Sequence, residues 1–232
     1  MKIINNKICL DSTEKRKFVP NVTLKDSSIE DCIKFAKEMA FGNGYHKPNS
    51  FGNSHDYRKP DEVFKNTLQG KIAELAFYIF CFKNKIILDR TPDFGVWPKG
   101  IWEDIDFTYN NGKICISIKS TKEFGNFLLL EKSKYNSEGM YIETENLIPL
   151  MYDYFFLIRI NGIDKTDPNK YTKPYDIVCE VAGFITFVQF KSIISNKQML
   201  FAGQILGIPL KVDNYYANIN ELINVNEFSR LL

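Results

Sequence analysis

The feature that most constrains this fold is the pair Asn111-Gly112, which lies between two runs of alternating residues, 104–109 and 113–119. A two-residue type I′ turn needs positive φ at both central positions, and Asn and Gly tolerate this best. The pattern therefore predicts a β-hairpin. Successive residues of a strand point to opposite faces, so the turn length decides which side chains meet.

A two-residue turn fixes the opposed pairs. These are Asn110 with Lys113, Thr108 with Cys115, Asp106 with Ser117, and Asp104 with Lys119. Opposed residues share a face, so one face gathers two carboxylates, a hydroxyl and an ammonium. The other is expected to face the core, and it carries Ile105, Phe107, Ile114, Ile116 and Ile118. A turn one residue longer would place Asp106 opposite Ile116, away from Lys119.

Length and composition indicate a globular protein. The 232 residues, 44% hydrophobic and 25% charged, suffice for one domain with a sizeable core. Apolar stretches fall short of the roughly 18 residues of a membrane span, and the first seven residues lack the apolar core of a signal peptide. We expect a cytoplasmic protein without a membrane partner.

Cysteine spacing and net charge narrow the class of protein only a little. The five cysteines form no Cys-x-x-Cys pair, which argues against zinc ribbons. A net charge of +2 permits nucleic-acid binding without indicating it.

The periodicity of apolar residues predicts helices from about Ser27 to Ala40 and from Asp61 to about Phe82. Besides the hairpin, strands are predicted at 85–89, 127–130, 154–160, 177–185 (interrupted at Gly183) and 205–212. Asn218 and Glu221 indicate the start of a closing helix. With no repeat or clear linker, we expect residues 1–232 to form a single mixed α/β domain.

The segment 42–60 is rich in Gly, Asn, Pro and aromatic residues and contains both histidines. Loops of this length are usually functional or mobile. A metal site on the histidines lacks a third ligand at a supporting spacing. A surface loop whose Arg58 and Lys59 contact DNA phosphates is better supported, and Lys122 is a further candidate for such contact. Residues 1–60 are therefore expected to contribute to DNA binding.

Glu74 is the only charged residue from Ile72 to Phe82. A carboxylate within an apolar helical run is costly unless it is paired, hydrogen-bonded or bound to a metal. Clustered carboxylates can hold Mg²⁺ for phosphodiester hydrolysis, and a neighbouring lysine can orient or deprotonate the attacking water. Glu74, Asp106 and Lys119 would provide such a set.

In order and spacing these residues resemble the PD-(D/E)XK, or restriction-endonuclease-like, nuclease superfamily. Its pattern is a helix Glu, an Asp on one strand of a hairpin, and an acidic-x-Lys tripeptide on the next. The matching text is GKIAE at 70–74, DIDF at 104–107 and ISIKS at 116–120, and the resemblance covers about residues 60–122. It implies a restriction-endonuclease-like mixed sheet core flanked by helices.

The resemblance also implies roles for individual residues. Asp106 would be the central metal ligand, Lys119 the water-activating lysine and the backbone carbonyl of Ile118 a further ligand. Ser117 departs from the pattern because it stands where the family usually has an acid, and Glu74 would then supply the missing carboxylate. Asp104 is expected to support Lys119. Asp93, in Thr91-Pro92-Asp93, is a less favoured alternative to Asp106 because it lies well before the hairpin.

The function implied by the resemblance is a Mg²⁺-dependent endonuclease acting on double-stranded DNA. Chains of this size resemble type II restriction endonucleases, which commonly act as homodimers on palindromic sites. A DNA-repair nuclease and a catalytically inactive relative are nearby alternatives. A non-enzymatic nucleic-acid-binding module or an interaction protein would leave Asp106 and Lys119 as a surface ion pair, worth under about 1 kcal/mol.

Overall fold

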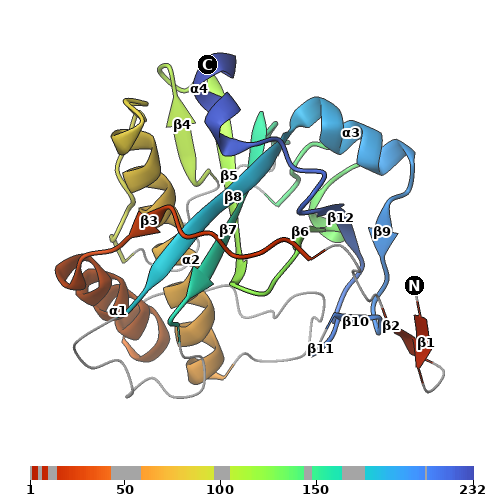
Figure 1. Cartoon of the computed structure of the whole chain (residues 1–232), viewed down its shortest axis with the longest axis horizontal. Coiled ribbons are helices and arrows are strands. Elements are labelled where there is room, and N and C mark those ends of the chain that lie inside the picture. The colour runs from red at the N-terminus through yellow and green to blue at the C-terminus, as the bar shows by residue number, and fades with distance from the viewer. Residues whose placement is uncertain are drawn as a thin grey trace.

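The computed structural model describes residues 2–4, 7–9, 15–42, 59–96, 105–143, 148–163, 176–206 and 208–232. Over these ranges the chain is a mixed α/β protein with four helices, a curled five-strand mixed sheet and a small antiparallel sheet (Figure 1). This confirms the α/β prediction. Within the same ranges, no helix has both the length and the apolar character needed to cross a membrane.

The helices are α1 (Asp26–Phe41), α2 (Pro60–Lys83), α3 (Phe187–Ser195) and α4 (Phe228–Leu231), with 3-10 turns η1 (Lys132–Lys134) and η3 (Val225–Glu227). The five-strand sheet contains β3 (Val22–Thr23), β4 (Phe107–Tyr109), β5 (Ile114–Lys122), β7 (Tyr154–Asn161) and β8 (Val178–Thr186). The small sheet contains β6 (Phe127–Glu131), β9 (Met199–Leu200) and β12 (Asn214–Asn218). A further set of short strands comprises β1 (Lys2–Ile4), β2 (Lys7–Cys9), β10 (Ile205–Leu206) and β11 (Ile208–Pro209).

The five-strand sheet has the order β3-β8-β7-β5-β4, in which β5 and β7 run parallel and the other neighbours antiparallel. The side chains of β7 alternate between two cores. Phe156 and Ile158 join the core beneath α1 and α2, whereas Phe155 and Leu157 join a second core formed with β6, β12 and α3. The sheet therefore separates two apolar layers, with α1 and α2 at the left in Figure 1 and α3 at the right.

Both long helices and the hairpin confirm the sequence predictions. α1 buries Ile29, Cys32, Ile33 and Ala36 on the predicted face. Asn111 and Gly112 have φ of 57° and 78°, as a type I′ turn requires, and Thr108 pairs with Cys115. The prediction that Ile105 shares a face of the hairpin with Phe107 is wrong. Ile105 packs against the second core, because β4 begins only at Phe107 and Ile105 lies before the paired residues.

Two predicted strands differ from the structure. Residues 85–89 are not a strand, since Lys85 adopts φ of 62° and the contact with the hairpin is a hydrogen bond from Asp89 N to Thr108 O at 3.0 Å. The region 205–212 holds β10 and β11 instead of one strand, and these pair antiparallel with each other. Here the chain reverses where an extended run was predicted.

The predicted interruption at Gly183 is instead a β-bulge within a continuous β8. The pairing with β7 shifts register between Leu157 and Ile158, opposite this glycine. Gly183 has φ of 149°, and a Cβ there would lie 2.7 Å from Ile223 O. A glycine is therefore required where the chain near Ile223 crosses β8.

The closing helix predicted at Asn218 is also wrong, although its local capping bonds form. Asn220 N donates to Asn218 Oδ1 at 3.0 Å, and Asn218 N donates to Glu221 Oε2 at 2.7 Å. The chain then pairs Ile223 with Phe184 of β8 instead of winding into a helix. Tertiary pairing overrides the local signal, and the final helix starts at Phe228.

A buried ionic network fastens residues 15–21, the N-terminal strap, which crosses β8 and β7 (Figure 1). Arg159, 1% exposed, pairs with Glu180 through Nε and Nη2. Its remaining N–H groups donate to the carbonyls of Arg16, Lys17 and Glu123 at 2.8–3.1 Å. All five guanidinium donors of Arg159 are thus satisfied.

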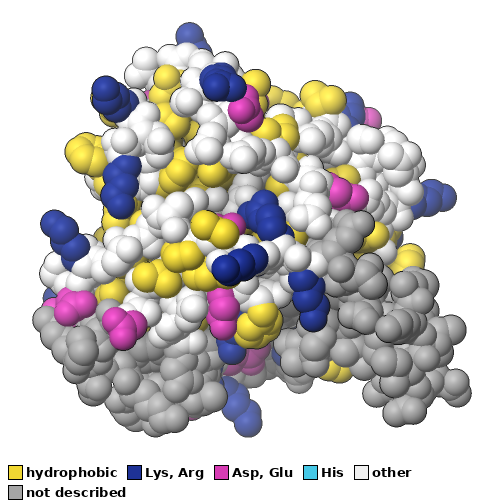
Figure 2. Space-filling model, viewed as in Figure 1, with side chains coloured by type: hydrophobic (Ala, Val, Ile, Leu, Met, Phe, Trp, Pro, Cys, Tyr) yellow, Lys and Arg dark blue, Asp and Glu magenta, His cyan; other side chains and the backbone are white. Residues whose placement is uncertain are grey.

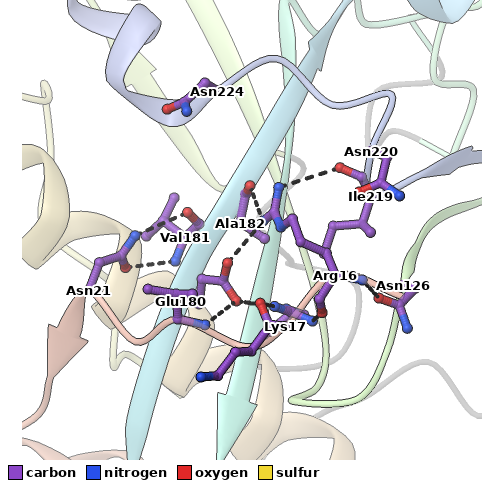
Figure 3. Close-up of polar contacts among 12 residues, drawn as sticks. Arg16, Lys17, Asn21, Asn126, Glu180, Val181, Ala182, Ile219, Asn220 and Asn224 are labelled. Carbon is purple, nitrogen blue, oxygen red and sulfur yellow. Dashed lines mark hydrogen bonds and ion pairs between the residues drawn. The ribbon is translucent and has the colours of Figure 1, made fainter. Parts of the chain in front are cut away.

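The strap also contributes its own side chains to this network (Figure 3). Arg16 Nη2 donates to Glu180 Oε1 at 2.9 Å and to Ala182 O at 2.6 Å. Asn21 exchanges two hydrogen bonds with the backbone of Val181. The network is a structural clamp between the strap and β8.

Candidate active site

The hairpin brings Asp106 next to the β5 backbone. The observed register pairs Phe107 with Ile116 and Thr108 with Cys115, and Asp106 directly precedes the first residue of β4. The Asp106 carboxylate accepts a hydrogen bond from Ile118 N at 2.6 Å. Because the N–H and C=O of one strand residue point toward the same neighbour, the Ile118 carbonyl is directed to the Asp106 side as well.

Lys119 projects from the face of β5 that is turned away from α2. Ile116 and Ile118 belong to the core under α2, and residues in between point the other way. Gln69 of α2 donates to the Ser120 hydroxyl at 2.9 Å, which identifies the α2 side independently. Ser117 and Lys119 therefore lie on the opposite face.

The environment of Lys119 is unusual for a lysine. Burial lowers the pKa of its ammonium, the carboxylate of Asp106 opposes that effect, and the positive charge of Lys134 adds to the lowering. A larger fraction of neutral amine is then available near pH 7 than in an exposed lysine. This is the property needed to accept a proton from water.

Ser117 is fully buried beside this pair, and its hydroxyl has no hydrogen-bond partner among the described residues. Buried polar groups without a partner are uncommon in folded proteins and call for a physical explanation. The hydroxyl lies on the same face as Lys119. Together with the Asp106 carboxylate and the Ile118 carbonyl, it makes this part of the sheet rich in oxygen donors.

Glu74 lies in a different environment. Its carboxylate forms an ion pair with Lys71 Nζ at 2.5 Å, and that ammonium also lies 4.9 Å from the Phe35 ring centre and 5.7 Å from that of Phe94. Phe35 belongs to α1, so these contacts place Glu74 against α1. The structure brings Asp106 and Lys119 together, whereas Glu74 lies on the α2 side of the sheet.

The other predicted residues are scattered. Lys59 is exposed at the start of α2, and Lys122 Nζ lies 5.7 Å from the Phe124 ring centre at the end of β5. Asp93 is half-buried and accepts a hydrogen bond from Gly95 N at 2.7 Å. Asp104, Arg58 and both histidines lie outside the described residues.

The donor set around Asp106 is too small for a metal site built entirely from protein ligands, but it suits a Mg²⁺ ion that keeps several waters. In the described part of the chain, no three His, Cys, Asp or Glu side chains gather to hold a metal. Mg²⁺ typically keeps several waters and takes one or two carboxylates plus substrate phosphates. Asp106 and the Ile118 carbonyl fit that mode of binding.

The structure adds neighbours that the sequence interpretation missed. Lys134 Nζ lies 3.2 Å from Glu143 Oε2 and 3.7 Å from Glu131 Oε2. Burial first, and then the charges of Tyr141, Asp106, Glu131 and Glu143, raise the pKa of the Tyr135 phenol. Lys134 is visible in the sequence, but its approach to β5 depends on long-range packing.

The chain matches no protein-family profile, no curated protein and no solved structure. The fold and the site therefore stand on their own geometry. That geometry is a mixed α/β scaffold with a carboxylate, a desolvated lysine and a hydroxyl that has no partner in the described part of the chain.

Proposed function

We propose that this protein is a Mg²⁺-dependent endonuclease that hydrolyses phosphodiester bonds of double-stranded DNA. The observation that carries the proposal is the hydrogen bond from Ile118 N to Asp106 at 2.6 Å, which holds this carboxylate against β5 next to the half-buried Lys119. An exposed surface ion pair would leave the lysine pKa near its ordinary value. The lowering by burial favours a catalytic use of the amine.

The proposed roles follow from the atoms available. One Asp106 oxygen is bound by Ile118 N, so the other, with the Ile118 carbonyl, would hold Mg²⁺. When bound, Mg²⁺ would neutralise charge on the phosphate. Lys119 orients the attacking water and accepts its proton. Ser117 is fully buried, so its hydroxyl can donate a hydrogen bond only to a buried water.

A restriction-endonuclease-like fold and a type II restriction activity belong to this proposal. The mixed sheet, the helix α2 before the hairpin and the Asp106–Lys119 placement are compatible with the family pattern. A homodimer on palindromic DNA would place two such sites on opposite strands. Lys and Arg side chains are dispersed over the face in Figure 2, so that view alone indicates no DNA surface.

A second candidate is a nucleic-acid-binding protein that has lost catalysis. Ser117 stands in place of the family acid, and Glu74 is paired with Lys71 on the other side of the sheet. Asp106 alone would leave a metal site with little negative charge. Such a protein would bind DNA in a salt-sensitive manner without cleaving it.

Plasmid cleavage tests the proposal. Wild-type protein with Mg²⁺ is expected to nick or linearise supercoiled plasmid, and EDTA should stop it. Asp106→Asn, which keeps an acceptor for Ile118 N, and Lys119→Ala should each reduce the rate by about 10²–10⁴-fold. Lys113→Ala, at the exposed hairpin turn, is the matched control and should cleave normally.

Three outcomes would count against the proposal. Intact plasmid with a persistent gel shift would favour the binding protein. Full activity of Asp106→Asn would remove that residue from the site. An equal loss in Lys113→Ala would show that lysine removal acts on the hairpin rather than on catalysis.

A further inference from the structure

The strand β5 is longer than its neighbour β4, so part of its edge lies beyond the reach of that strand. β4 pairs with β5 only as far as Ile116, whereas β5 continues well past that residue. The backbone groups of successive strand residues point to opposite neighbours, so those of Ile118 and Ser120 face the β4 side, as those of Ile116 do. Lys119, between them, pairs with Leu157 of β7. The backbone on either side of Lys119 therefore needs hydrogen-bond partners other than β4.

Two side chains take the place of the missing strand. The Asp106 carboxylate accepts a hydrogen bond from Ile118 N at 2.6 Å. On the other side of Lys119, Gln69 Nε2 donates to Ser120 O at 3.2 Å and to Ser120 Oγ at 2.9 Å. One side chain thus holds the residue before Lys119, and one holds the residue after it.

The helix that carries Gln69 is itself firmly placed. Its neighbours Leu68 and Ile72 on α2 are buried in the same core as Ile116 and Ile118 of β5. This packing sets the separation of the helix and the strand, and the amide of Gln69 spans it to Ser120. The contact therefore ties the position of the strand edge to that of α2.

Gln69 is a costly residue for a purely structural role. It is 9% exposed, and its Oε1 is buried without a hydrogen-bond partner in the ranges that the structure describes. The amide cannot be reversed, because Ser120 O only accepts and must face the N–H₂ group. A leucine of similar size would avoid the unpartnered oxygen. The presence of a glutamine is best explained by what its donor group holds.

We propose that Gln69 is a positioning residue for cleavage, which fixes the β5 backbone at Ser120 and thereby aims Lys119 at the phosphate beside Asp106. The inference rests on the proposed nuclease function. Gln69 lies on the α2 side of the sheet and Lys119 on the other, so the effect passes through the backbone. A displacement of about 1 Å at a reacting group can reduce the rate about 10²-fold without weakening substrate binding.

The test compares Gln69→Leu with Gln204→Leu in cleavage of supercoiled plasmid. Gln204 is the matched control, because it is also a buried glutamine, whose Oε1 accepts from Phe201 N at 2.7 Å between β9 and β10. Gln69→Leu should lower kcat by about 10–100-fold, with KM within about twofold of wild type. Its Tm should stay within about 4 °C of wild type. Gln204→Leu should leave kcat within about twofold, whatever its Tm.

A double-mutant cycle separates positioning from a general loss of stability. Ser120→Ala removes only the hydroxyl contact and should lower kcat by about fivefold, the size of one neutral hydrogen bond. In the Gln69→Leu background, Ser120→Ala should cost less than about twofold more, since the contact is already lost. Independent losses that simply multiply would overturn the proposed link between Gln69 and Ser120.

Other results would also overturn the inference. Gln69→Glu keeps the shape but turns an acceptor toward Ser120 O, so it should be as impaired as Gln69→Leu. Higher activity of Gln69→Glu would make position 69 a metal-binding position instead. If Gln69→Leu fails to fold, Gln69→Met replaces it, and wild-type kcat or a loss confined to KM contradicts positioning. A wild-type protein that does not cleave would instead remove the nuclease proposal itself.

Discussion

Arg159 of β7 and Lys119 of β5 lie in adjacent rows on the same face of the central sheet, yet their surroundings differ. Arg159 on β7 has all five donors bonded, to Glu180 and to three carbonyls. On β5, Lys119 is desolvated with one nearby carboxylate, and the neighbouring Ser117 hydroxyl has no partner among the described residues. Arg159 pairs with Thr121, and Lys119 with Leu157, so the two groups occupy adjacent rows.

The difference separates a structural use of buried charge from a functional one. A fully bonded network holds the N-terminal strap on β8 and leaves nothing for a ligand to bind. An incompletely satisfied group is a local cost to folding, and such costs concentrate where a protein binds or reacts. The comparison therefore predicts that disrupting the Arg159 network lowers the stability of the fold, whereas removing Lys119 abolishes cleavage without lowering stability.

The largest effect is expected at the Arg159 network. Glu180→Ala leaves Arg159 buried without its counter-ion, so we expect a loss of about 3–5 kcal/mol in the free energy of unfolding. Chemical denaturation measures it. Glu227→Ala, which breaks the exposed Arg230–Glu227 pair, is the control and should change stability by less than about 1 kcal/mol.

A double replacement sharpens the same point. Arg159→Met with Glu180→Leu removes both charges, and we expect a smaller loss than in Glu180→Ala, since no unpaired charge stays buried. Chemical denaturation of the double variant and of Glu180→Ala compares the two losses in the free energy of unfolding. If Glu180→Ala were no worse than Glu227→Ala, the network would not be the structural clamp described here.

An intermediate effect is expected at Glu74, which tests whether it is structural or catalytic. Glu74→Gln weakens the ion pair with Lys71, so we expect a loss of about 1–2 kcal/mol. The Mg²⁺ concentration required for plasmid cleavage should stay unchanged. A strongly raised requirement would instead make Glu74 the compensating carboxylate that the family pattern suggests.

Local chemistry explains which parts of the fold were predictable. Asn111-Gly112 determines the hairpin by itself, and apolar spacing determines α1 and α2. The helix α3 was not predicted, although Thr186 and Gln189 form a capping box at its start. The strand β12 depends on its distant partners β6 and β9, which no local pattern reveals.

The same reasoning applies to the site. Lys119 lies on β5 and Asp106 directly precedes β4, so both belong to the hairpin that Asn111-Gly112 predicts. Lys71 precedes Glu74 by about one helical turn, and that partner was visible in the sequence. The charge of Lys134 acts on Lys119, and the neighbouring Tyr135 ring lies 6.1 Å from that of Phe155, a contact between elements that no periodicity predicts.

The most direct test of the contrast is Lys119→Met, assayed for plasmid cleavage and for Tm on the same preparation. Below its lowered folded-state pKa, Lys119 is held protonated at a cost that disappears as pH rises to its ordinary value of 10.5. We predict that Lys119→Met loses cleavage while its Tm near pH 7 rises by about 2–4 °C, a gain that shrinks toward pH 10.5. Retained cleavage together with a lowered Tm would show that Lys119 supports the fold and would contradict the account.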